Sequence, residues 1–207
     1  MDLSTIAVVA FDCDGVMFDT EATNRIFYNT ILKAFHLPPM TEAQFRFVHM
    51  ATVGEALAHL FQGQVDLAEV RRKTAEFDYS SLIPDMVMEP HLKALLQKLA
   101  PKYKRAIATN RSNTMAGVLE THGLTGDFEL VVTSSEVKNA KPAPDQLHLI
   151  MEHFDVKASE ILYIGDSPTD QLAARAAQVP FIAFGNTKLE ADFHMNRLCE
   201  VEELLKL

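Results

Sequence analysis

The sequence predicts an α/β protein: a doubly wound parallel sheet that carries an inserted α-helical cap subdomain. Short apolar, β-branched runs recur along the chain, which is typical of strands buried on both faces. After Pro84, amphipathic helical segments alternate with these runs, and such alternation favours right-handed crossovers in a parallel sheet. Between residues 21 and 82 the pattern is helical and no strand-like run interrupts it.

The elements follow from these patterns in chain order. Strands are expected at residues 6–11, 105–109, 130–133, 161–164 and 181–184. Helices of the sheet domain are expected at residues 91–99, 113–122, 145–154 and 172–177. Proline residues punctuate the helical stretch at Pro38, Pro39 and Pro84. We therefore expect residues 1–18 and 84–207 to form the core and residues 19–83 to form the helical cap.

Composition excludes several classes of partner. The formal net charge is −9 and no Lys/Arg cluster occurs, so a nucleic-acid partner is not expected. No apolar stretch approaches the roughly 20 residues of a membrane span, and no membrane association is expected. The two cysteines, Cys13 and Cys199, do not suggest a structural disulfide, so we expect a cytoplasmic protein. A monomer or a homodimer is expected.

Two acids one residue apart, Asp12 and Asp14, follow the first predicted strand. Side chains alternate along an extended backbone, so both carboxylates would project to the same side, and Gly15 permits a sharp turn after them. Close carboxylates suit a hard cation such as Mg²⁺, and they can also divide into a nucleophile and an acid/base. The alternative is that the acids only solubilise a turn.

Two later strand ends carry complementary groups. The Thr109 hydroxyl and the backbone N–H groups near Asn110 could bind phosphate at the start of the next helix. Lys141 precedes Pro142, which disfavours helix at the lysine and leaves its amine free to point inward. Lys138 is the rival lysine, but it lacks the following proline.

The last strand end combines an acid with a helix start. Ser167, Pro168 and Asp170 match an N-cap, a first-turn proline and a capping-box partner. That pattern explains Asp170 without a metal, although Asp170 could also support metal-bound water. Asp166 lies between the strand end and the cap, where it would face the same crevice as Asp12. We therefore expect Asp166 to be a direct Mg²⁺ ligand.

In this order, Asp-Cys-Asp-Gly-Val, Thr-Asn, Lys-Pro and Gly-Asp-Ser-Pro-Thr-Asp resemble the four-motif signature of the haloacid dehalogenase-like hydrolase superfamily. The phosphatase branch with a helical cap, which includes phosphoglycolate phosphatases and β-phosphoglucomutases, is the most similar. The resemblance implies a Rossmann-like core, Asp12 as a nucleophile that forms an aspartyl-phosphate, and Asp14 as the acid/base. The implied catalytic residues are Asp12, Asp14, Thr109 and Lys141. The implied phosphate-binding residues are Asp12, Thr109, Asn110 and Lys141, and the implied metal ligands are Asp12, Asp14, Asp166 and Asp170.

The resemblance implies Mg²⁺-dependent hydrolysis of a small phosphate monoester, with phosphoglycolate or a sugar phosphate as substrate. A β-phosphoglucomutase-like mutase is the alternative, because Val16 stands where mutase-like members also carry valine. A catalytically silent binding protein of the same fold is the second alternative. The stretch 48–55 is expected to face the site, with His49 and Thr52 as specificity residues. Arg46 could also face the site, or it could lie on a solvated helix face.

Overall fold

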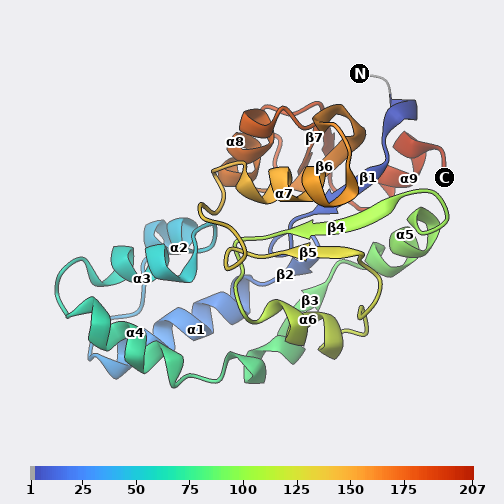
Figure 1. Ribbon diagram of the computed structural model, residues 1–207. Coiled ribbons are helices and arrows are strands. Elements are labelled where there is room, and N and C mark those ends of the chain that lie inside the picture. The colour runs from blue at the N-terminus through green and yellow to red at the C-terminus, as the bar shows by residue number, and fades with distance from the viewer. Residues whose placement is uncertain (1–2) are drawn as a thin grey trace.

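The computed structural model describes residues 3–207, and within them a six-stranded parallel sheet forms the centre of the molecule (Figure 1). The strand order is β5-β4-β1-β6-β7-β8. The strands are β1 (Val8–Phe11), β4 (Lys104–Ala108), β5 (Leu130–Val132), β6 (Ile161–Gly165), β7 (Phe181–Phe184) and β8 (Phe193–Met195). The predicted fold class is confirmed. The edge strand β8 was not predicted, because its three residues, Phe-His-Met, alternate with a polar side chain and form no apolar run.

Helices cover both faces of the sheet. One face packs against α7 (Asp145–Phe154) and α8 (Pro168–Ala177), and the other against α5 (Leu92–Leu99), α6 (Met115–Thr121) and α9 (Glu200–Leu205) (Figure 1). Alternate residues of β1 belong to the two apolar clusters, with Val8 and Ala10 on the α7 side and Val9 and Phe11 on the α5 side. Burial on both faces explains why the strand sequences are continuously apolar. Two 3₁₀ turns, η1 (Leu3–Thr5) and η3 (Ala158–Glu160), complete this part.

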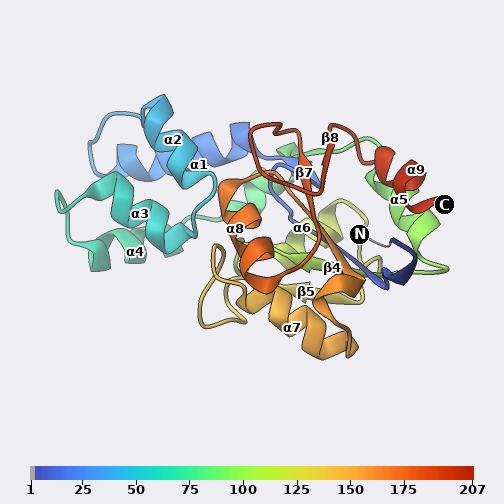
Figure 2. The same ribbon diagram turned by 90° about the horizontal axis from the view of Figure 1, so that it is seen from above.

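The chain between β1 and α5 forms a helical insert, which we define as α1 to α4 and η2. These are α1 (Glu21–Ala34), α2 (Glu42–Val48), α3 (Val53–Phe61), α4 (Leu67–Ala75) and the 3₁₀ helix η2 (Tyr79–Asp85). They pack around an apolar cluster of their own, drawn from residues 27–82. Figure 2 shows the four α-helices at one end of the molecule, opposite α5 and α9.

A two-stranded antiparallel ribbon joins the insert to the sheet domain. It pairs β2 (Phe18–Asp19) with β3 (Val87–Met88), so the chain leaves and re-enters the sheet domain at one place. The ribbon follows directly from the turn that carries the first acidic pair. The insert is therefore attached beside the carboxyl end of β1. None of the described helices is long and apolar enough to cross a membrane.

Candidate active site

A cavity of about 490 Å³ lies where the helical insert meets the carboxyl ends of the central strands. β1 is flanked by β4 and β6, so the residues that follow these three strands converge. Six of the predicted site residues of the core line the cavity: Asp12, Asp14, Thr109, Asn110, Lys141 and Asp166. Asp170 is fully buried behind them. The topology therefore gathers the predicted core residues at one place.

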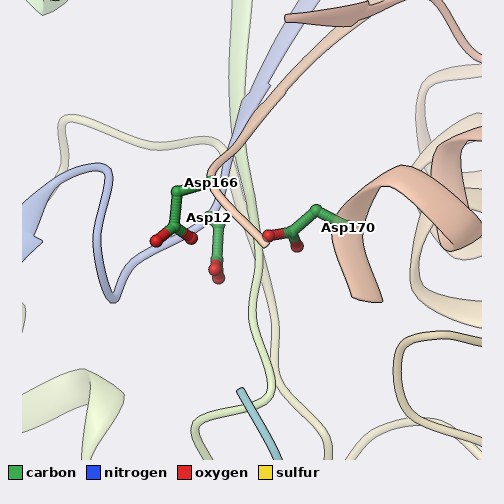
Figure 3. Close-up of side chains that lie close together, drawn as sticks. All are labelled: Asp12, Asp166 and Asp170. Carbon is green, nitrogen blue, oxygen red and sulfur yellow. The ribbon is translucent and has the colours of Figure 1, made fainter. Parts of the chain in front are cut away.

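Three carboxylates form the centre of this site (Figure 3). Asp12 follows β1, Asp166 follows β6, and Asp170 lies in the first turn of α8; one oxygen from each lies within 4.8 Å of the others. Burial raises the pKa of Asp12 to about 7, and the neighbouring carboxylates add to this effect while Lys141 opposes it. Burial and the carboxylates of Asp170 and Asp12 also raise the pKa of Asp166. Clustered oxygen ligands that repel one another fit a hard divalent cation, which would relieve the repulsion.

Lys141 supplies the positive charge of this cluster. Its side chain is only 2% exposed, and its ammonium lies 2.9 Å from Asp12 Oδ1 and 2.6 Å from Asp170 Oδ1. It also donates to the Tyr163 hydroxyl at 2.9 Å and to the last carbonyl of β4 at 2.9 Å. Burial alone would lower the pKa of Lys141, but the two carboxylates raise it, so the amine stays charged. The rival Lys138 is exposed on the surface.

Asp170 uses both of its oxygens within the protein. Oδ1 accepts hydrogen bonds from Lys141 and from the Tyr163 hydroxyl, each at 2.6 Å. Oδ2 accepts from the Ser167 hydroxyl at 2.5 Å and completes the capping box that starts α8. The predicted capping box is therefore present. Tyr163, which the sequence analysis did not single out, gives no signal beyond its place in a buried strand.

Asp14 points to a different partner. Its carboxylate forms a two-pronged ion pair with Arg111, whose Nε and Nη2 donate to Oδ2 and Oδ1 at 3.1 and 2.6 Å. Burial would raise the pKa of Asp14, but the Arg111 charge outweighs it and holds the pKa below its usual value. Arg111 was not among the predicted site residues. The available signal was its position, two residues after the strand-end Thr109.

Thr109 and Asn110 follow β4, and their hydrogen bonds link the end of this strand to neighbouring loops and to the insert. The buried Thr109 hydroxyl accepts a hydrogen bond from the Arg111 backbone N–H at 3.2 Å. The Asn110 amide donates to the carbonyls of Lys141, at 3.0 Å, and of Met50, at 3.2 Å, and so ties the core to the insert. Gln146, another buried residue that the sequence analysis missed, donates to the Thr109 carbonyl at 2.6 Å.

The predicted specificity residues of the insert have different surroundings. His49 lines the cavity, and its Nδ1 lies 3.1 Å from the Asn24 side-chain amide. Thr52 instead forms the N-cap of α3, with its hydroxyl and backbone N–H bonded to the Glu55 carboxylate. It is not among the residues that line the cavity, because the capping box directs its side chain along the helix start. Arg46 lies on the exposed helix face.

Gly15 is expected to tolerate no side chain. Its φ is +82°, and a Cβ there would lie 2.1 Å from Asp166 Oδ2. Gly15→Ala should therefore displace Asp166, lower the affinity for a divalent cation and cost about 1–3 kcal/mol in unfolding free energy. Gly54→Ala is the matched control, since a Cβ at Gly54 meets nothing within 4 Å. Urea unfolding and metal titration check both variants, and equal behaviour of the two would contradict the expected contact.

Known proteins resemble this chain over most of its length. Residues 9–184 match the haloacid dehalogenase-like hydrolases. The chain belongs to this family. A phosphoglycolate phosphatase of Vibrio parahaemolyticus is 31% identical over 86% of this chain and 82% of the relative. A fructose-1-phosphate phosphatase of Escherichia coli is 29% identical, over 83% of this chain and 92% of the relative.

A solved structure agrees with these relatives. A haloacid dehalogenase-superfamily hydrolase of subfamily IA from Geobacter sulfurreducens is 38% identical, with a TM-score of 0.79 and 97% of each chain covered. The family that the four motifs predicted is therefore confirmed, and its members are hydrolases. Phosphatases of this family generally use a divalent metal, and the three-carboxylate cluster of this chain offers a place for one.

Proposed function

We propose that this protein is a Mg²⁺-dependent phosphatase that hydrolyses a small phosphate monoester through an aspartyl-phosphate on Asp12. The observation that carries the proposal is the charge arrangement around Asp12: a buried Lys141 ammonium at 2.9 Å, within a cluster of three carboxylates. A phosphate dianion can approach a carboxylate nucleophile only where positive charge neutralises it. The named relatives, both phosphatases of small molecules, support the same chemistry.

The proposed reaction has two steps that use this chain's own groups. In the first, an Asp12 oxygen attacks phosphorus and the bond from phosphorus to the ester oxygen breaks. The proton for the leaving alcohol comes from the protonated form of Asp14, which is a minor form at neutral pH because, despite burial, Arg111 lowers its pKa. In the second, water attacks the phosphorus of the aspartyl-phosphate and gives a proton to Asp14, and the bond to Asp12 breaks to release phosphate. Lys141 and Thr109 would contact the phosphoryl oxygens from the side of β4.

The metal would be held by Asp12, by Asp166 and by the Asp14 backbone carbonyl. Asp170 would support the site from behind, since both of its oxygens already accept hydrogen bonds from the protein. When bound, Mg²⁺ supplies positive charge that offsets the repulsion between the phosphate and the carboxylates. We assign Mg²⁺ rather than a softer metal because the donor set consists of oxygen atoms.

We further propose that residues 19–83 act as a cap over a core of residues 1–18 and 84–207, and that the cap sets substrate selectivity. The core groups contact the phosphoryl group, which every phosphate ester shares. A cavity of about 490 Å³ lies within the roughly 300–1,000 Å³ of small-molecule sites. We propose phosphoglycolate first and a sugar phosphate second. Cytoplasmic location and a monomeric or homodimeric state stay predictions from the sequence.

The mutase alternative is less well supported. A bisphosphorylated sugar intermediate needs cationic groups for a second phosphate. Among the cavity-lining residues in the described part of the chain, Lys141, Arg111 and His49 are the basic side chains. Lys141 contacts Asp12 and Arg111 contacts Asp14, so no basic cluster is left over. A catalytically silent protein is disfavoured as well, because the side chains that the proposed reaction needs all line one cavity.

The test is phosphate release from a panel of phosphate esters with Mg²⁺, before and after addition of excess EDTA. We expect turnover of 4-nitrophenyl phosphate and of at least one small natural ester, with EDTA lowering it by about 100-fold or more. Readdition of Mg²⁺ should restore activity. Activity that is indifferent to EDTA would contradict the metal dependence. Conversion of glucose 1-phosphate to glucose 6-phosphate faster than phosphate release would favour the mutase.

A further inference from the structure

We propose that Arg111 is a positioning residue that holds the carboxylate of Asp14 in the orientation needed for proton exchange with the ester oxygen. This inference rests on the proposed function, in which Asp14 is the acid/base. Its basis is the two-pronged contact of Arg111 Nε and Nη2 with the two Asp14 oxygens, at 3.1 and 2.6 Å. A guanidinium presents its donors in a rigid fork, so a two-pronged contact fixes the plane of the carboxylate as well as its distance.

The guanidinium is itself held from two further sides. Its Nη1 donates to the Thr114 hydroxyl at 3.1 Å, and its Nη2 lies 3.4 Å from the Tyr79 hydroxyl. The Tyr79 ring faces the guanidinium at 5.2 Å, a distance at which cation–π attraction contributes. The Arg111 side chain is only 6% exposed. A buried cation with partners at the N-cap of α6, in η2 and in the turn after β1 has little freedom to reorient, and its carboxylate partner is held with it.

The other basic side chains that line the described part of the site have different hydrogen-bond or ion-pair partners. Lys141 contacts Asp12 and Asp170, and the imidazole of His49 contacts Asn24. Each carboxylate oxygen can accept about two hydrogen bonds. The Arg111 fork and a further hydrogen bond from the Thr20 side chain therefore still leave a position on Asp14 that can carry the exchanged proton. The contact therefore orients the acid/base without occupying it fully.

Orientation of a proton donor matters most for esters with poor leaving groups. An alkoxide must be protonated as it departs, whereas a nitrophenolate is stable enough to leave with much less help. A misplacement of about 1 Å can cost about 100-fold in rate. Loss of Arg111 should therefore damage alkyl ester hydrolysis more than aryl ester hydrolysis. The value of kcat/KM is the suitable measure, because it reports the steps up to departure of the leaving group.

The experiment compares Arg111→Met and Arg111→Lys with wild type on 4-nitrophenyl phosphate, phosphoglycolate and glycerol 1-phosphate. For Arg111→Met we expect kcat/KM to fall about 100-fold on both alkyl esters and at least tenfold less on the aryl ester. Arg111→Lys should recover part of the loss on alkyl esters. Thr114→Val, which removes one hydrogen bond to the guanidinium, should show a smaller loss with the same preference. Arg175→Met is the matched control, since Arg175 is exposed and outside the cavity.

Three outcomes would overturn the proposal. Equal losses on aryl and alkyl esters would give Arg111 a structural role only. A loss confined to the KM of phosphoglycolate would mean that Arg111 binds the substrate carboxylate instead. Wild-type protein without Mg²⁺-dependent release from any ester would contradict the proposed function itself, together with this inference. If Arg111→Met does not fold, the same comparison of Arg111→Lys and Thr114→Val decides the question.

Discussion

Asp12→Asn is expected to lower turnover of every substrate by at least about 10⁴-fold, because the amide is too weak a nucleophile to attack phosphorus. Stopped assays with purified protein and Mg²⁺ measure this. The fold should survive. Asp12 has its pKa raised from 3.8 to about 7, so its charge costs folding free energy that is absent below about pH 4 and grows as the pH rises toward 7. Asparagine removes that cost, but it also removes one of the two carboxylates that contact the Lys141 ammonium, while Asp170 remains as its partner. These effects oppose each other, and we expect a thermal midpoint near that of the wild type in EDTA at pH 8.

Asp85→Asn is the control for this substitution, since Asp85 is exposed and does not line the cavity. It should retain wild-type activity. An Asp12→Asn protein with turnover within tenfold of wild type would contradict the assigned nucleophile. An Asp12→Asn protein that unfolds would instead show that the carboxylate is needed for stability, contrary to the direction of its raised pKa.

Lys141→Met is expected to lower activity strongly and to destabilise the protein at the same time. The substitution preserves length but leaves Asp12 and Asp170 without their ammonium, and both are buried. Removing one partner of a buried ion pair costs about 3–5 kcal/mol of unfolding free energy. The pKa of Asp12 would rise further without the cation, so less of the nucleophile would be ionised at neutral pH. We expect turnover to fall by about 10²–10³-fold or more.

Lys138→Met is the matched control, because Lys138 lies three residues away and is exposed. Urea unfolding in EDTA and turnover with Mg²⁺ should both stay close to wild type for this variant. If the two lysine variants behave alike, the Lys141 ammonium does not provide the charge that stabilises the buried carboxylates of Asp12 and Asp170. If Lys141→Met loses activity but no stability, the ion pairs of Lys141 with Asp12 at 2.9 Å and with Asp170 at 2.6 Å contribute to catalysis and not to the free energy of unfolding.

Local sequence patterns predicted the fold class and most of the core elements. β1 is apolar at each position because helices bury both of its faces, and this signature is visible without a structure. The Ser167–Asp170 capping box is equally local, since its partners lie three residues apart. The edge strand β8 and the two-residue strands β2 and β3 were missed, because their pairing depends on neighbours distant in sequence rather than on their own composition.

The order of strands and motifs along the chain was enough to predict that Asp12, Asp14, Lys141 and Asp166 lie at one edge of a sheet, because parallel strands end on the same side and the motifs follow strands. Which of these groups are partners became visible in the folded chain. Asp14 pairs with Arg111, 97 residues away, rather than with the three-carboxylate cluster. Lys141 reaches Asp12 and Asp170 across two loops. Ion-pair energies fall steeply with distance and rise on burial, so the choice between partners depends on packing distances that no one-dimensional pattern contains.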